Sequence, residues 1–295
     1  MTLAKSSTSP VFTRRRLLTG GVLGAAALAL YAGEGERHWI DLTRIDITVP
    51  GLPEAFDGFC IAQLSDIHLI AWTEPSFLRR AISHINALKP DAVCLTGDFV
   101  SEAPDSPQFP INAAWQCAQI LTGIECRQIY GILGNHDVIV GSDEVTKAMR
   151  THGVTMLRNE YVAIERGGSR FWLAGVDDPL KGTPDPAAAI PERIRNVPKE
   201  PVILMCHAPD YVDDLITQPA GKAVSLVLSG HTHGGQVRVP FVGPLTLPEL
   251  GRKYVEGYFR LGNTQLYVNR GIGTVGVPFR FDCPPEITLL TLRRG

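Results

Sequence analysis

The chain has 295 residues, of which 44% are hydrophobic, and a formal net charge of −2. This length suits one large domain or two small ones with a real core, and the charge gives no basic footprint, so no nucleic-acid partner is expected. Six scattered cysteines are too few for a disulfide framework in a chain of this length, although Cys117 and Cys126 could still pair.

Residues 1–38 predict an N-terminal signal or membrane anchor with a linker. Arg14, Arg15 and Arg16 precede an uncharged Gly/Ala-rich run that ends at Gly33. Weak hydrophobicity behind paired arginines resembles a twin-arginine export signal, which predicts export to the periplasm or cell envelope. The run falls short of the ~20 apolar residues of a comfortable spanning helix. An anchor through residues 17–33 is nevertheless the alternative, and both cleavage of the signal and the side of the membrane stay open.

Residues 39–295 are predicted to form one continuous domain in which strand and helix signals alternate. Apolar strand-like runs and amphipathic helical runs follow one another in the order strand 59–64, helix 73–89, strand 92–95, helix 111–121, strand 128–133, helix 142–153, hairpin 161–174, helix 186–196, strand 202–205, helix 211–217 and strand 223–228. The tail from residue 237 predicts strands and loops. Continuous apolar strands between helices indicate an α/β fold with sheets covered on both faces.

Polar side chains follow five of these buried strands. Such strand ends are where open α/β sheets collect their ligands. Five of the eight histidines fall in these blocks, which together contain Asp66, His68, Asp98, Asn135, His136, Asp137, His207, His231 and His233.

The residue types in these blocks indicate a metal site. Buried carboxylates and imidazoles are costly unless a cation compensates them. Oxygen and nitrogen ligands without a thiolate favour Mn, Fe, Zn, Co or Ni. Seven ligands suit two divalent ions that share one carboxylate. Asp66 and His68 can face the same ion because side chains at i and i+2 of an extended segment point the same way. The glycines around His231 and His233 are expected to leave room for a substrate phosphate and to let the loop turn.

The ordered blocks D-x-H, GD, GNHD, H and GHTH resemble the calcineurin-like metallophosphoesterase superfamily. The closing GHTHGGQ and the late VNRGIGTVGVPFRFDCPPEITLLTL are similar to its branch of bacterial phosphodiesterases with N-terminal export or anchor signals. The resemblance implies an α/β four-layer sandwich, in which two mixed β-sheets are flanked by helices, with a dinuclear metal site between the strand ends.

The resemblance also implies a role for each site residue. One ion would be held by Asp66, His68 and His233, and the other by Asn135, His207 and His231. Asp98 would bridge them. His136 would stand beside the leaving group, oriented by Asp137. The implied enzyme is a phosphodiesterase in which a metal-bridging hydroxide attacks phosphorus while His136 assists the departing oxygen.

The segment from Gly97 to Glu102 departs from two specialised branches. It lacks the Asp-Arg of the protein Ser/Thr phosphatases and the tyrosine of the purple acid phosphatases. By analogy this favours a phosphodiester or pyrophosphate substrate. The N-terminal signal would place the enzyme beside envelope or lipid-linked phosphates, and the resemblance to the branch also implies UDP-diacylglucosamine-pyrophosphatase-like activity. The alternative is a catalytically silent binding module, which predicts an eroded site. Arg252, Lys253 and Arg270 are weak candidates for contact with a substrate phosphate, because solvated surface charge explains any one of them equally well.

Overall fold

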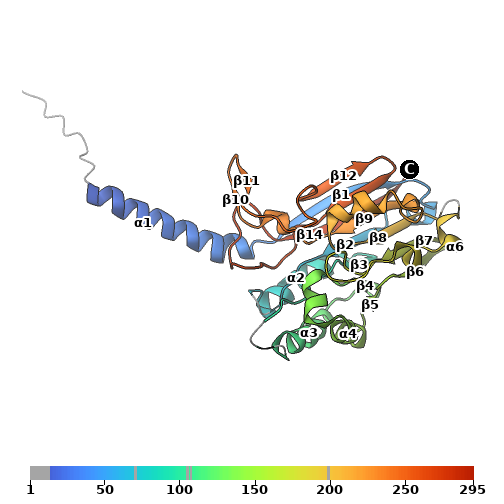
Figure 1. Ribbon diagram of the computed structural model, residues 1–295, viewed down its shortest axis with the longest axis horizontal. Coiled ribbons are helices and arrows are strands. Elements are labelled where there is room, and N and C mark those ends of the chain that lie inside the picture. Colours follow the sequence, from blue (N-terminus) through green and yellow to red (C-terminus); the bar gives the residue numbers. More distant parts are fainter. Residues whose placement is uncertain (1–13, 70–71, 104–105, 107, 198–199) are drawn as a thin grey trace, which may run out of the picture.

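A computed structural model describes residues 14–69, 72–103, 106, 108–197 and 200–295. The expectations for residues 1–13 therefore lie outside the described part of the chain. Two six-stranded mixed sheets pack against each other, and helices cover their outer faces (Figure 1). The predicted four-layer α/β sandwich is confirmed.

The first sheet contains both ends of the domain. The last strand of the chain lies between the first two, parallel to β1 and antiparallel to β2, and the remaining neighbours run parallel. The strand order is β1 (Asp41–Val49), β14 (Glu286–Arg294), β2 (Cys60–Leu64), β3 (Ala92–Leu95), β4 (Ile129–Gly131) and β5 (Thr155–Met156).

The second sheet is parallel in its centre and antiparallel at both edges. The predicted hairpin forms one of those edges. The strand order is β12 (Gly257–Leu261), β13 (Thr264–Val268), β9 (Val224–Ser229), β8 (Val202–Met205), β7 (Ser169–Gly175) and β6 (Glu160–Arg166). A separate two-stranded hairpin pairs β10 (Arg238–Val239) with β11 (Gly243–Pro244).

Three apolar clusters hold the layers together. The middle cluster lies between the sheets and includes Phe56, Phe59 and Phe171, all buried. The other two pack helices onto the outer faces: α2 (Pro75–Leu88), α3 (Gln108–Leu121) and α4 (Asn135–Thr151) on the first sheet, and α5 (Pro186–Ala189), α6 (Glu192–Arg195) and α7 (Val212–Leu215) on the second. The single helix expected over 186–196 is two short helices, because Pro191 interrupts the hydrogen-bond ladder.

Helix α4 begins at Asn135, seven residues before the predicted start at Ser142. Gly141 has a non-helical φ of 141°, so the predicted helix is only the second part of a kinked element. The extra first part is capped by Asp137, whose Oδ2 accepts a hydrogen bond from Gly134 N at 3.0 Å. This early start places Asn135 and His136 in a helical first turn at the end of β4.

Helix α1 (Arg14–Leu30) projects away from the sandwich (Figure 1). It continues through η1 (Tyr31–Gly35) and η2 (Glu36–His38), which makes a helical run of 25 residues with a mean hydropathy of 1.4 in its most apolar window. By length and composition this helix could cross a membrane, and a signal sequence meets the same two criteria. The sequence predicted an apolar run that is too short to span a membrane comfortably. The observed helix is longer than that run because it continues beyond Gly33 into the charged residues that join it to the domain.

Candidate metal centre

The carboxyl ends of five strands meet at one place between the sheets. Strands β2, β3 and β4 are parallel neighbours in one sheet, and β8 and β9 in the other. Backbone hydrogen bonds tie the loops that follow them: Asp66 N to Gly97 O at 3.0 Å, His68 N to Asp98 O at 3.0 Å, and Gly230 N to His207 O at 3.1 Å. Bonds from His136 N to Asp98 Oδ1 at 2.9 Å and from His231 N to Asp66 Oδ2 at 3.0 Å join the remaining loops, so every predicted ligand belongs to one connected loop cluster.

Two groups of ligand atoms lie next to each other. Asp66, His68 and His233 form one, with His233 Nε2 at 3.5 Å from Asp66 Oδ1 and at 3.1 Å from His68 Nε2. Asp98, His207 and His231 form the other, with His207 Nε2 at 3.1 Å from Asp98 Oδ2. Asp98 Oδ2 also lies 3.6 Å from His68 Nε2, so one carboxylate stands between both groups.

Two buried atoms indicate that this arrangement suits cations. Asn135 Oδ1 and His207 Nε2 are inaccessible to solvent and have no hydrogen-bond partner of acceptable geometry. Orphaned polar atoms of this kind are costly unless something binds them. A third group joins His68 and Asp98 to His136, so a nitrogen of His136 also lies close to the centre.

Three of the imidazoles are oriented through their second ring nitrogen. His68 Nδ1 contacts Ser101 Oγ, His207 Nδ1 contacts Thr96 O, and His231 Nε2 contacts Glu249 O, each at 2.7 Å. Such contacts fix the tautomer and the ring plane of a metal-binding histidine. His68 and His207 therefore present Nε2 to the centre, whereas His231 presents Nδ1.

Burial dominates the electrostatics of the cluster. It lowers the pKa of His68 to about 3 and that of His231 to about 4, so both rings are neutral and able to coordinate at neutral pH. Burial also lowers the pKa of His207, but the carboxylates of Asp98 and Asp66 outweigh it and hold this pKa well above its ordinary value. Without a cation, His207 carries the proton that a metal would displace.

Metal loading is therefore expected to release a proton from His207. Since the pKa of this histidine is raised, the release should be present at neutral pH, and metal affinity should increase with pH until His207 is deprotonated in the apo protein. Calorimetric titration of Mn²⁺ in two buffers of different ionisation enthalpy measures the released protons. Heats that do not depend on the buffer would contradict this prediction.

Five of the predicted ligands adopt a left-handed backbone conformation. Their φ angles range from 47° to 73°, in Asp66, His68, Asp98, His231 and His233. Such conformations cost about 1–3 kcal/mol each in non-glycine residues and concentrate at functional sites. The sandwich therefore holds these loops in a strained backbone geometry that brings their side chains together at the centre.

The glycines around the centre make room for the ligands. A Cβ on Gly230 would lie 2.4 Å from Asp66 Oδ2, and one on Gly134 would lie 2.2 Å from Asp98 Oδ1. The expectation that the glycines around His231 and His233 admit a substrate phosphate is wrong at Gly230, where the carboxylate of Asp66 fills the space. Gly134 makes room for Asp98 in the same way.

Gly230→Ala is accordingly expected to displace Asp66 and Ser65, whose Oγ would lie 1.9 Å from the new Cβ. The expected result is a loss of metal binding together with a lower melting temperature, measured by metal analysis after desalting and by thermal unfolding. Gly24→Ala in α1, where no atom lies within 4 Å, is the control. Full metal content in the Gly230 variant would contradict the packing interpretation.

His136 is oriented by Glu102 and not, as expected, by Asp137. The Nδ1 of His136 hydrogen-bonds to Glu102 Oε2. The carboxylate of Asp137 is buried and accepts hydrogen bonds from the backbone N–H groups of Phe99 at 2.9 Å, Val100 at 3.3 Å and Gly134 at 3.0 Å. Asp137 thus fastens the Asp98 loop to α4 and acts on the site through the backbone.

Among the described residues, the predicted cationic candidates Arg252, Lys253 and Arg270 do not line the cavity over the centre. Arg270 donates to Glu286 Oε2 at 3.1 Å and to Asp41 Oδ2 at 2.7 Å, so its charge is already compensated. Arg252 is exposed and, among the described residues, does not line the cavity over the centre. The arginine that does line it is Arg238, which pairs with Glu256.

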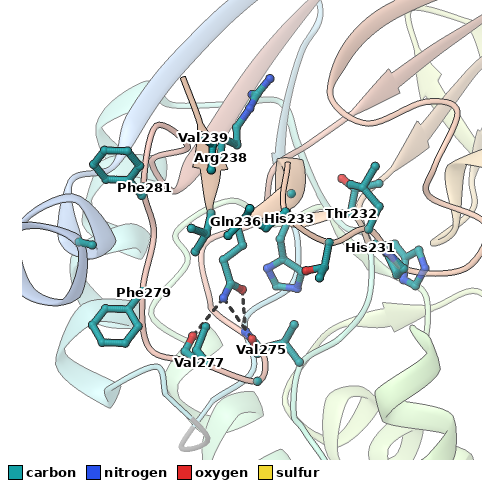
Figure 2. A pocket seen from close by; sticks show the side chains of 18 of the residues that line it. His231, Thr232, His233, Gln236, Arg238, Val239, Val275, Val277, Phe279 and Phe281 are labelled. Carbon is teal, nitrogen blue, oxygen red and sulfur yellow. Dashed lines mark hydrogen bonds between the residues drawn. The ribbon is translucent and has the colours of Figure 1, made fainter. Parts of the chain in front are cut away.

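Two residues with structural roles at the site were not predicted from sequence. Arg280 is fully buried and donates to the carbonyls of Gly273 at 2.6 Å and Cys283 at 3.1 Å, while its Nη2 lies 3.4 Å from His233 Nδ1. Gln236, the last residue of GHTHGGQ, bonds to Val275 through both its amide oxygen and its amide nitrogen (Figure 2). Both join the histidine loop to the C-terminal segment. All six cysteines, Cys117 and Cys126 included, are free thiols.

A cavity of about 1160 Å³ lies directly over the centre. His136, His231 and His233 line its floor, and its walls are largely apolar (Figure 2). The oxygen and nitrogen ligands at this cavity suit divalent metal ions, and together with the family of the chain they identify a metal-dependent phosphoric ester hydrolase.

The chain belongs to the calcineurin-like phosphoesterase family, whose model matches residues 60–235. It is 36% identical to the uncharacterized metallophosphoesterase YkuE of Bacillus subtilis, over 95% of this chain and 98% of that protein. It is 30% identical to phosphodiesterase YaeI of Escherichia coli, over 96% of this chain and 100% of that protein. It is 26% identical to UDP-2,3-diacylglucosamine pyrophosphatase LpxG of Chlamydia trachomatis, over 91% of this chain and 94% of that protein. The family resemblance inferred from the motifs is confirmed.

Proposed function

We propose that the chain hydrolyses a phosphodiester or pyrophosphate bond with two divalent cations of the Mn, Fe, Zn, Co or Ni class. The observation that supports two ions is the position of Asp98 Oδ2, at 3.1 Å from His207 Nε2 and 3.6 Å from His68 Nε2. Asp98 would be shared, and the remaining ligands would divide into Asp66, His68 and His233 for one ion and Asn135, His207 and His231 for the other.

The chain's own contribution to catalysis is proton transfer and positioning. The bound ions would supply Lewis acidity to the phosphoryl group and acidify the attacking water. His136 stands at the cavity floor with Nδ1 held by Glu102, so Nε2 can carry a proton to the departing oxygen. Burial lowers the pKa of His136, but Asp98 and Glu102 outweigh it and raise this pKa above its ordinary value, which favours the protonated form near neutral pH.

Substrate and location are proposed from the relatives and from α1. One relative is named a phosphodiesterase and another a UDP-2,3-diacylglucosamine pyrophosphatase, which supports a diester or pyrophosphate in an envelope or lipid-linked molecule. Arg14, Arg15 and Arg16 begin α1. Because basic residues stay on the cytoplasmic side of a membrane helix, this supports a domain exported on a twin-arginine-like signal or held outside by residues 17–33.

Hydrolysis of a chromogenic aryl diester and of the matching monoester tests this function. The chelator-stripped protein would be reloaded with each metal in turn, and the diester is expected to be cleaved faster than the monoester. Tight binding of metal without turnover of either ester would favour the silent binding module. Preferential monoester cleavage would contradict the substrate class.

A further inference from the structure

The cavity over the metal centre has more apolar wall than a small hydrophilic phosphate ester requires. Above the histidine floor, its lining includes Leu247, Val275, Val277, Phe279 and Phe281. Sites for small ligands are usually cavities of about 300–1,000 Å³ with a few polar groups that fix orientation. This cavity reaches about 1160 Å³, and most of its lining residues are apolar.

One wall of the cavity belongs to the candidate membrane helix. Ala25, Leu28 and Ala29 of α1 and Ala32 of η1 lie at helical spacing, and all four line the cavity. Phe279 and Phe281 point from the C-terminal segment toward the helix (Figure 2). The cavity therefore extends from the metal centre to the place where α1 leaves the domain.

The base of α1 is held to the domain by polar contacts, most of them through η2. Glu36 Oε1 accepts a hydrogen bond from Cys283 N at 2.6 Å, and Arg37 donates to Trp72 O at 2.7 Å and to Glu74 Oε1 at 2.9 Å. The backbone N–H of Arg280 donates to Ala32 O at 3.0 Å. These contacts fix the helix in one direction relative to the cavity.

The β10–β11 hairpin forms an apolar rim on the same cavity. Val239, Pro240 and Leu245 line the cavity, while Phe241 and Val242 at the hairpin tip are exposed. Figure 1 shows the hairpin beside the base of α1. Clustered exposed apolar side chains on a folded domain mark a protein or membrane interaction site. Because they adjoin a helix that can cross a bilayer, a membrane is the surface that fits.

Exposed aromatic side chains surround the base of the helix. Tyr31 and Trp39 are exposed, and so is Trp72, whose backbone carbonyl holds Arg37. Trp and Tyr are enriched where a membrane protein passes through the headgroup region. Their position fits a bilayer surface at the base of α1.

We infer that the cavity is an acyl-chain channel that opens to the membrane surface. The hydrocarbon of a membrane lipid enters between α1 and the β10–β11 hairpin, whose tip inserts into the bilayer interface. The phosphodiester or pyrophosphate of that lipid then reaches the histidine floor. This inference rests on the proposed function and narrows its substrate to a lipid of the same membrane that holds α1.

Competition by matched phosphodiesters tests the channel. The full chain would be placed in nanodiscs of digalactosyldiacylglycerol, a bilayer lipid without phosphate, and hydrolysis of the aryl diester would be inhibited by lysophosphatidylglycerol or by glycerophosphoglycerol, which lacks the acyl chain. The acylated competitor is expected to inhibit at a concentration roughly tenfold lower or more, because each buried methylene contributes to binding. Equal inhibition by the two compounds would overturn the channel.

Two substitutions in α1 separate the channel from simple partitioning into the bilayer. Ala29→Trp would fill the cavity, whereas Ala27→Trp adds the same bulk at a position of the same helix that does not line it. Only the former should remove the preference for the acylated competitor. An unchanged preference in the Ala29 variant would overturn the proposal.

The hairpin is tested in the same assay. Phe241→Asp should weaken inhibition by the acylated competitor, whereas Phe109→Asp, at an exposed site on α3, should leave it unchanged. Equal effects of the two substitutions would overturn insertion of the hairpin. If the wild-type chain hydrolyses no diester with any metal, that result contradicts the proposed function. If it hydrolyses the diester but shows no preference for the acylated competitor, that result contradicts only the channel.

Discussion

Asp98→Ala is expected to reduce diester turnover by roughly a thousandfold or more, since loss of a single preorganised electrostatic group already costs about 10²–10³ in rate. Its carboxylate stands between the two ligand groups and also accepts a hydrogen bond from His136 N at 2.9 Å. The substitution therefore removes the proposed bridge and loosens the first turn of α4. Bound metal should fall from two ions to one or none, as measured by elemental analysis after desalting.

The matched control for this change is Asp143→Ala, because the Asp143 side chain is almost fully exposed. It should retain both the activity and the metal content of the wild-type protein. An Asp98→Ala protein that binds two ions and cleaves the diester at the normal rate would contradict a bridging role.

His136→Gln is expected to lower kcat by about 10²–10⁴ for an alkyl diester, which is the usual contribution of general acid catalysis. An aryl diester should lose much less, because its leaving group departs without a proton. Comparison of kcat for the two substrates measures this difference. Metal content should be unchanged, since His136 is proposed to act on the leaving group.

His84→Gln is the control for His136, because His84 lies on α2 away from the cavity. Equal losses on the alkyl and aryl diesters would contradict the acid role of His136. A fall in metal content would instead indicate that His136 is a ligand, as its proximity to His68 and Asp98 allows.

The sequence predicted the ligand cluster because each block directly follows a buried strand. Parallel neighbours align their carboxyl ends, so the loops after β2, β3 and β4 must meet at one sheet edge. Apolar strand patterns were enough to locate Asp66, Asp98 and Asn135. The four-layer arrangement came from the family resemblance, since strand patterns alone do not specify how two sheets stack.

The partners of His136 and Asp137 could not be predicted in the same way. Asp137 is adjacent in sequence to His136, but the helical first turn directs its carboxylate to backbone N–H groups. Glu102 lies 34 residues away and reaches His136 only because α4 begins early. The helix start was misplaced because Ser142 is a good capping residue, whereas the N-cap of the observed helix is Gly134 and the capping carboxylate comes from Asp137 at the N3 position.

The charge partners of Arg270 and the walls of the cavity depend on long-range contacts. Asp41 lies 229 residues from Arg270, so the ion pair between them leaves no local pattern. The cavity joins α1 to the segment from Val275 to Phe281, which the insertion of β14 beside β1 brings together. The roles of Gly134 and Gly230 could not be predicted from sequence either, because they depend on a clash between an added Cβ and a distant carboxylate and not on local backbone freedom.

The most direct test of the dinuclear centre is a titration of the chelator-stripped chain with Mn²⁺ while aryl-diester turnover and bound metal are measured together. Turnover is expected to rise with metal content and to level off when two ions are bound per chain. Full turnover in the presence of excess chelator, or a plateau at a single bound ion, would contradict the assignment of Asp98 as a ligand shared by two metals.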